Sequence, residues 1–343
     1  MEKLNIASIF CGIGGGDLGI TGGFVFLNKE YPRLPVKLVY ANDNYEEACN
    51  IFEANFNFGC DRRDIRNVTS EEIPDHDILL AGFPCQSFSI VAQYPPRLGY
   101  KSENGKLFFE IVRILKTKKP KAFIAENVKG ILSANKKRAF PLIMDELSKA
   151  GYNVAYKLFN AAEWGIPQKR ERVFIVGIRK DLRLQPRFPV RYGNRKLVTL
   201  KEIIFDNSII DKKYFFSERA VSGLIKSNPS MNKGRAQKTN APCATVTSHL
   251  AKVSLNSTDP VLKVGKRYRR FTPQEVLRIQ AFPDNFKLLG SDFHKYKGIG
   301  NAIPPVLMWH VAREVIETIE ENDKAKTTGH LYRVPISVSL ANQ

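Results

Sequence analysis

Residues 4–16 read Leu-Asn-Ile-Ala-Ser-Ile-Phe-Cys-Gly-Ile-Gly-Gly-Gly, and this stretch decides the fold class. An apolar run of strand length enters a glycine-rich turn at Phe10, and a helical pattern follows to about Leu27. Glycine lets the backbone approach a ligand closely, and a helix that starts there offers its amide groups to that ligand. The stretch therefore predicts the first strand, turn and helix of a ligand-binding α/β sheet.

The alternation of strands and helices continues to about residue 179. A polar segment at 28–35 holds two prolines and is interpreted as a loop. The predicted strands are 36–41, 77–81, 121–125, 154–159 and 172–178, and the predicted helices are 45–55, 106–117 and 140–150. This order is typical of an α/β fold with a doubly wound, mainly parallel sheet and helices on both of its faces.

The pattern weakens after residue 179, which indicates a second, smaller and irregular domain at 191–270. A clear helix start returns at Thr272, with Pro273 at the first helical position and Glu275 three residues after the cap. We interpret 271–295 as a hinge or brace. Residues 1–190 and 296–322 form the large domain, with a last helix from 305 to about 321, and 323–343 are a tail.

The charge of the chain suggests a polyanionic partner. Lys and Arg number 53 against 34 Asp and Glu, giving a net charge of +19. Residues 179–270 alone hold 21 basic and six acidic side chains. Such a concentration is typical of nucleic-acid binding, although a merely solvated surface is the alternative.

Composition also excludes several classes of protein. No apolar run reaches the roughly 18 residues of a membrane span, and no signal peptide is recognised, so we expect a cytoplasmic protein without a membrane partner. The cysteines number five and lack C-x-x-C spacing, which argues against disulfides or a zinc site; we expect no metal. Cys49 and Cys60 are expected to be small buried apolar residues.

Polar and reactive groups follow four of the predicted strands. They are Phe10 with the glycine turn, Asn42-Asp43, Gly82-Phe83-Pro84-Cys85-Gln86, and Glu126-Asn127. Ligands of doubly wound sheets bind beyond the carboxyl ends of the strands, so these four segments are expected to converge on one site.

Each segment has a chemical interpretation. Asp43 can hold a ribose diol, which favours an adenosine-type cofactor; Asp17 fits the dinucleotide fingerprint poorly. Cys85 in its turn can act as a thiolate nucleophile, and a buried Glu126 has a raised pKa suited to holding a proton. The basic stretch 168–172 is either a solvated strand edge or a source of two arginines for the same cleft.

Together these motifs resemble the cytosine-5 DNA methyltransferases of bacterial restriction–modification systems. Six motifs occur in the family's order: Phe10-Cys11-Gly12-Ile13-Gly14-Gly15, Gly82-Phe83-Pro84-Cys85-Gln86-Ser87, Glu126-Asn127-Val128, the Q-x-R-x-R pattern of 168–172, 270–283, and Gly300-Asn301-Ala302-Ile303. The resemblance spans nearly the whole chain.

The resemblance implies S-adenosylmethionine as cofactor, on a Rossmann-like fold, and a cytosine flipped out of duplex DNA as substrate. It implies that Cys85 attacks carbon 6, that Glu126 protonates ring nitrogen 3, and that Arg172 holds the base's carbonyl oxygen and positions Glu126, with Arg170 completing the catalytic set. Product S-adenosylhomocysteine follows from the transfer. The region 191–270 becomes the target-recognition domain.

The resemblance also assigns binding residues. For the cofactor these are Phe10, Gly12, Ile13, Gly14, Gly15, Asp43, Asn44, Asp64, Ile65, Pro84, Leu107, Asn301 and Ala302. For DNA they are Gln86, Ser87, Arg97, Thr245, Lys266, Arg267, Arg269 and Arg270. We expect a monomer whose cognate restriction endonuclease, where one exists, acts separately.

One departure and three alternatives stay open. The family's aspartate-x-arginine-glycine pattern is replaced by Ser102-Glu103-Asn104-Gly105, so a phosphate contact falls to Arg97 or is absent. The alternatives are a tRNA cytosine methyltransferase with the same core, a nicotinamide-dependent oxidoreductase, and an inactive DNA-binding protein. The intact set of Cys85, Glu126 and Arg172 argues against the last.

Overall fold

The computed structural model describes residues 3–83, 106–191, 196–226, 236–251, 259–265 and 267–328. Six residues of the expected site lie outside the described residues: Pro84, Cys85, Gln86, Ser87, Arg97 and Lys266. Within the described ranges, no helix is long and apolar enough to cross a membrane.

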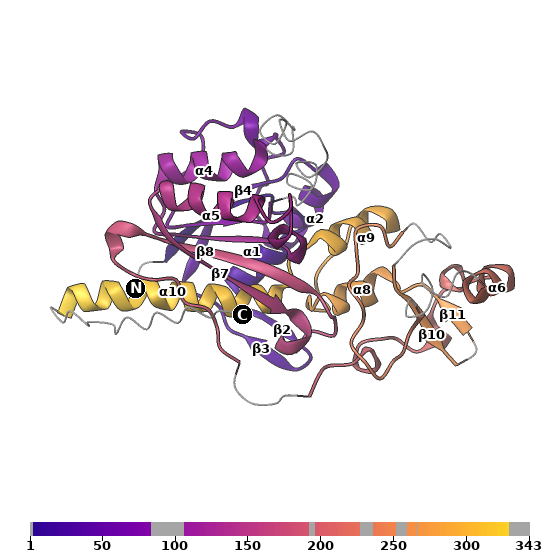
Figure 1. Cartoon of the computed structure of the whole chain (residues 1–343). Coiled ribbons are helices and arrows are strands. Elements are labelled where there is room, and N and C mark those ends of the chain that lie inside the picture. Colours follow the sequence, from indigo (N-terminus) through magenta and orange to yellow (C-terminus); the bar gives the residue numbers. More distant parts are fainter. Residues whose placement is uncertain are drawn as a thin grey trace.

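A six-stranded sheet forms the centre of the large domain (Figure 1). Its strands run in the order β4 (Val36–Asn42), β1 (Leu4–Ile9), β5 (Ile78–Ala81), β6 (Ala122–Val128), β8 (Glu171–Arg179) and β7 (Tyr152–Asn160). The pairs β4–β1, β1–β5 and β5–β6 are parallel, and β8 is antiparallel to both of its neighbours. The predicted mainly parallel sheet is confirmed.

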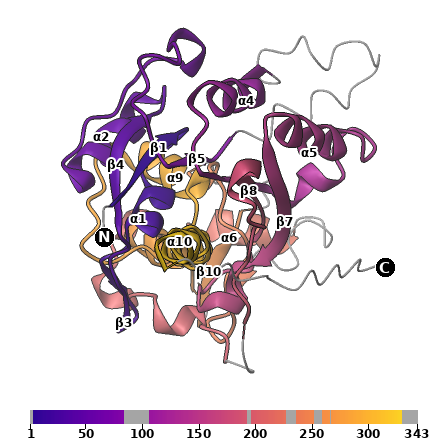
Figure 2. The ribbon, with the colours of Figure 1, turned by 90° about the vertical axis from the view of Figure 1, so that its left-hand side faces the viewer.

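Helices cover both faces of this sheet, as the sequence predicted (Figure 2). On one face α1 (Gly15–Thr21) and α10 (Pro305–Thr328) pack against side chains such as Ile6 and Ile124. On the other face α4 (Lys106–Lys118) and α5 (Ala139–Lys149) pack against their strand neighbours Ala7 and Phe123. Successive strand residues point to opposite faces, so strands buried on both sides are apolar at nearly every position.

The expected helix to Leu27 and the expected loop at 28–35 are both wrong in detail. Helix α1 ends at Thr21 because Gly22 and Gly23 adopt positive φ. A short antiparallel hairpin follows, with β2 (Phe24–Phe26) and β3 (Lys29–Tyr31). Its turn uses two further residues with positive φ at positions 27 and 28, a backbone conformation that the apolar pattern did not reveal.

The smaller part of the chain is irregular, and its own sheet is separate from the central one. That sheet has the order β11 (Arg267–Arg269), β10 (Val261–Val264) and β9 (Ala236–Gln237), and α6 (Glu218–Lys226) lies beside it (Figure 1). Helices α8 (Pro273–Ile279) and α9 (Asp292–Asn301) lead back to α10. The expected boundary between residues 295 and 296 falls inside α9. In the large domain, α2 (Glu46–Phe56) follows β4.

The predicted start of α8 is confirmed and holds a buried charge pair. Thr272 and Glu275 form a reciprocal capping box. The Glu275 carboxylate also receives two bonds from the Arg269 guanidinium, at 2.7 and 2.8 Å, and both side chains are at most 1% exposed. The expected DNA contact of Arg269 is therefore wrong, because its charge is neutralised inside the protein.

We predict that Arg269→Met lowers the free energy of unfolding by about 3–5 kcal/mol, because it leaves the Glu275 carboxylate buried without its partner. Urea denaturation followed by circular dichroism measures this. The matched control is Arg267→Met on the same strand, whose exposed guanidinium stacks 3.8 Å from the Phe215 ring. Equal losses in the two variants would contradict the assignment.

Candidate active site

A cavity of about 580 Å³ lies at the carboxyl ends of β4, β1, β5 and β6. The expected site residues that line it are Phe10, Gly12, Asp43, Asn44, Asp64, Ile65, Leu107, Glu126, Arg170, Arg172, Asn301 and Ala302. Ile13, Gly14 and Gly15 lie behind this wall. A Cβ on Gly14 would lie 2.2 Å from the Phe56 ring and one on Gly15 2.3 Å from the Ile303 carbonyl, so these glycines let the turn pack closely.

One end of the cavity is built around Asp43 at the end of β4. Its two carboxylate oxygens accept hydrogen bonds from the main-chain amides of Gly12 and Tyr45, each at 2.9 Å. These bonds tie the glycine turn to the start of α2. Burial raises the pKa of Asp43, while the two amides and the Lys297 ammonium favour its ionised form. A carboxylate held in this way can accept hydrogen bonds from a diol.

The other end of the cavity is built around Glu126 on β6. Its Oε1 lies 2.8 Å from Nε of Arg172, and both side chains are 10% exposed. The two residues meet because Arg172 at the start of β8 pairs with Val128, two residues after Glu126. Burial raises the pKa of Glu126, and the positive charges of Arg172 and Arg170 oppose this shift. The carboxyl group is thereby suited to hold and donate a proton.

Asn127 links β6 to the end of β5. Its side-chain amide donates a hydrogen bond of 3.0 Å to the main-chain carbonyl of Phe83, and both groups are buried. Phe83 precedes Cys85 by two residues, so this bond fixes the chain immediately before the expected nucleophile. The motif Glu126-Asn127-Val128 therefore contributes both a proton carrier and a backbone anchor.

Arg170 does not fit the catalytic role expected for it. Its side chain is 2% exposed, and its terminal nitrogens donate to the carbonyls of Val246, Gly300 and Ala302 at 3.0–3.1 Å. These carbonyls belong to the smaller part of the chain and to the segment around the end of α9. The guanidinium is committed to the backbone, so Arg170 is a positioning residue that joins the two parts beside the cavity.

The remaining expected DNA contacts lie in the smaller part of the chain. The Thr245 hydroxyl donates to the Lys169 carbonyl at 2.7 Å. Arg270 donates to the Lys213 carbonyl, and Arg267 is exposed. The position of this segment is set by close packing, because a Cβ on Gly300 would lie 2.3 Å from the Thr247 backbone. These three DNA contacts stay predictions.

Sequence reasoning missed several residues of the cavity wall, among them Ser8, Asp17, Tyr45 and Lys297 as lining groups. The Lys297 ammonium lies 3.5 Å from the centre of the Tyr45 ring, and the Tyr45 hydroxyl contacts Nδ1 of His294. Helix α9, which carries Lys297, has no strong apolar periodicity in the sequence. Asp17 was noticeable only as a misfit to the dinucleotide fingerprint.

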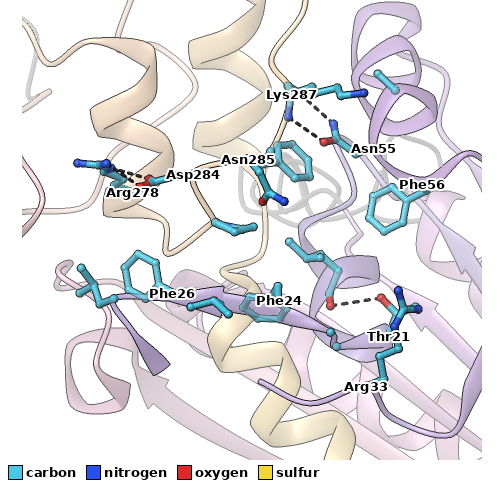
Figure 3. A pocket seen from close by; sticks show the side chains of 18 of the residues that line it. Thr21, Phe24, Phe26, Arg33, Asn55, Phe56, Arg278, Asp284, Asn285 and Lys287 are labelled. Atoms are coloured by element: carbon cyan, nitrogen blue, oxygen red, sulfur yellow. Dashed lines mark hydrogen bonds and ion pairs between the residues drawn. The ribbon is translucent and has the colours of Figure 1, made fainter. Parts of the chain in front are cut away.

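A second, larger cavity of about 1000 Å³ lies elsewhere, between α1, the β2–β3 hairpin and residues 283–287 (Figure 3). Its walls are held by hydrogen bonds between Asn55 and Lys287 and by the ion pair of Arg278 with Asp284. None of the four strand-end segments contributes to it. The smaller cavity is therefore the candidate active site, because the buried acid and base groups converge there.

Comparisons with known proteins identify the family of the chain. Residues 4–317 match the C-5 cytosine-specific DNA methylase family. The chain is 33% identical to the Type II methyltransferase M.FnuDI of Fusobacterium nucleatum, covering 94% of this chain and 97% of that protein. It is also 33% identical to the Type II methyltransferase M.HaeII of Haemophilus aegyptius, covering 93% and 95%.

Two solved structures share the fold. The methyltransferase EhMeth of Entamoeba histolytica has a TM-score of 0.74 at 17% identity, covering 93% of this chain and 99% of that one. A DNMT2 mutant of Spodoptera frugiperda has a TM-score of 0.71 at 20% identity, covering 91% and 99%. With the family match over residues 4–317, these findings show that the chain belongs to the C-5 cytosine-specific DNA methylase family, as its six motifs indicated.

Proposed function

We propose that this protein transfers a methyl group from S-adenosylmethionine to carbon 5 of a cytosine flipped out of duplex DNA, through a covalent bond to Cys85. The observation that carries the proposal is the buried Glu126–Arg172 pair, which shares one cavity with the Asp43 carboxylate. A proton donor for the base and a holder for a ribose thus lie at opposite ends of one binding site. The 33% sequence identity to Type II methyltransferases supports the modification of DNA in a restriction–modification system as the biological role.

The residues of the cavity fit the cofactor. S-adenosylmethionine supplies an electrophilic methyl group on a positively charged sulfur. Asp43 can hold its ribose, Phe10 can pack on its adenine, and Asp64 with Ile65 can contact the adenine edge. The Asp17 carboxylate is buried beside the cavity, and no basic side chain of the described residues pairs with it, which suits a site for a cation.

Catalysis is derived from the chain's own groups. The Cys85 thiolate forms a bond to carbon 6 of cytosine as Glu126 gives its proton to nitrogen 3. The electrons of the 5,6 double bond then form a double bond between carbons 4 and 5. Arg172 holds the base's carbonyl oxygen and keeps Glu126 in place. Carbon 5 is now nucleophilic and accepts the methyl group. Loss of the proton on carbon 5 and expulsion of the Cys85 thiolate restore the 5,6 double bond, and nitrogen 3 returns its proton to Glu126.

DNA as the substrate is supported by the positive charge of the chain and by the need to reach the target carbon. The target carbon is inaccessible inside a duplex, so the base must leave the stack, as is general for base-modifying methyltransferases. The basic segment 179–270 supplies side chains for phosphate contacts. We propose that the enzyme acts as a monomer in the cytoplasm and that any cognate restriction endonuclease acts separately.

The substrate assignment predicts that labelled S-adenosylmethionine methylates duplex DNA and not tRNA. Cys85→Ala should abolish this transfer while cofactor affinity, measured by calorimetry, stays within about twofold, because the nucleophile acts mainly in the transition state. Labelling of tRNA alone would overturn the substrate, and near-normal turnover by the variant would overturn the nucleophile.

Glu126→Gln should lower kcat by about 10²–10⁴-fold, because the amide cannot give a proton to the base. The active form of Glu126 is protonated and its pKa is raised, so wild-type kcat should be retained above the ordinary glutamate range and fall as pH rises through the raised pKa. Steady-state rates across pH measure this. The control is Glu163→Gln, an exposed glutamate outside the cavity, which should leave the profile unchanged. An unaltered kcat in Glu126→Gln would reject the assignment.

A further inference from the structure

The order of strands divides the candidate active site into three zones. Asp43 follows β4 at one end, and Glu126 with Arg172 lie on β6 and β8 at the other. Strands β1 and β5 lie between them. If the proposed function holds, the ribose binds at the first end and the base at the second, so the reacting sulfur and its methyl group must lie over β1 and β5.

Asp17 occupies this middle zone. It follows β1 on α1 and lines the cavity together with Ser8 of β1 and with Leu80 and Gly82 at the end of β5. Its side chain is 1% exposed, and among the described residues no hydrogen bond of ordinary geometry reaches either carboxylate oxygen, although the nearby Ser8 hydroxyl favours the ionised form. A buried charge without a partner is costly, so its presence beside a binding cavity indicates a partner that arrives with the ligand.

The charges around Asp17 in the described part of the chain do not neutralise it. The neighbouring Asp43 carboxylate repels it, and the Cys11 thiol on the glycine turn is a further titratable neighbour. The positive groups that line the cavity in the described part of the chain act elsewhere: Lys297 favours the ionised form of Asp43, and Arg172 and Arg170 favour the ionised form of Glu126. The middle zone therefore carries a negative potential that suits a cation.

We propose that Asp17 is the counter-charge for the sulfonium of S-adenosylmethionine and makes the enzyme discriminate against S-adenosylhomocysteine, whose sulfur is neutral. This rests on the proposed function. Both molecules share the adenosine, the carboxylate and the ammonium, and they differ at the sulfur. A charge placed at the sulfur therefore changes their relative affinity, whereas a contact to any shared group changes both affinities together.

The protonation of Asp17 supports this role. Burial, with a smaller contribution from the Asp43 carboxylate, raises its pKa to about 7, although the nearby Ser8 hydroxyl and the backbone oppose the shift. Near pH 7 the carboxyl group is thus partly protonated before the ligand binds. A cation beside it favours the ionised form, so binding of the sulfonium should release protons. When the methyl group leaves, the sulfur loses its charge and this attraction is lost, which favours exchange of the product.

The test is calorimetric binding of S-adenosylmethionine and S-adenosylhomocysteine to wild type and to Asp17→Asn. The variant should weaken S-adenosylmethionine about tenfold, equivalent to about 1.4 kcal/mol, and change S-adenosylhomocysteine less than twofold. Equal changes for both ligands, or no change for either, would overturn the inference.

Two controls separate this inference from other failures. Asp43→Asn should weaken both ligands by a similar factor, because both carry the ribose. Proton release by wild type is measured at pH 7 by calorimetry in buffers of different ionisation enthalpy, and it should be larger for S-adenosylmethionine than for S-adenosylhomocysteine. This readout does not depend on the folding of a variant. Equal proton release for the two ligands overturns the inference. Wild type that binds neither ligand overturns the proposed function itself.

Discussion

The ion pair between Glu126 and Arg172 is the interaction on which the proposed chemistry of this protein depends. Two ionisable groups taken out of water are stable only when they face one another, and here two neighbouring antiparallel strands bring them together. The same burial raises the pKa of Glu126, which suits the carboxyl group to hold a proton. The antiparallel strand β8 is therefore as important to the site as the parallel strands that deliver the other groups.

A second constraint is the connection between the two parts of the chain. Arg170 and Gln168, just before β8, reach main-chain and side-chain groups around residues 246, 280 and 300. These contacts are buried, so the smaller part cannot move far from the cavity without leaving polar groups unpaired. One polar network thus couples the smaller part of the chain to the start of β8, the strand that carries Arg172.

Much of the fold could be predicted from the sequence. Short apolar runs that end in polar residues indicate parallel strands, and segments with helical apolar periodicity indicate the helices between them. The convergence of Asp43 and Glu126 followed from their places at strand ends, whereas the sequence pattern left Arg172 open between a solvated edge and the cleft. All three residues line one cavity. The β2–β3 hairpin was missed because its turn depends on positive φ angles. Arg269 and Arg170 were misassigned because a basic residue in a basic segment has the same sequence signal whether it pairs inside the protein or faces DNA. Asp17 could not be interpreted before its burial and lack of a partner were seen.

The central claim is that the cavity methylates cytosine in DNA. Bisulfite sequencing of genomic DNA from a host that expresses the protein tests it most directly, with a host carrying Cys85→Ala alongside. The account predicts protected cytosines confined to one short sequence and absent with the variant, which also supplies the recognition sequence. Soluble protein in the cells without any newly protected cytosines would contradict it.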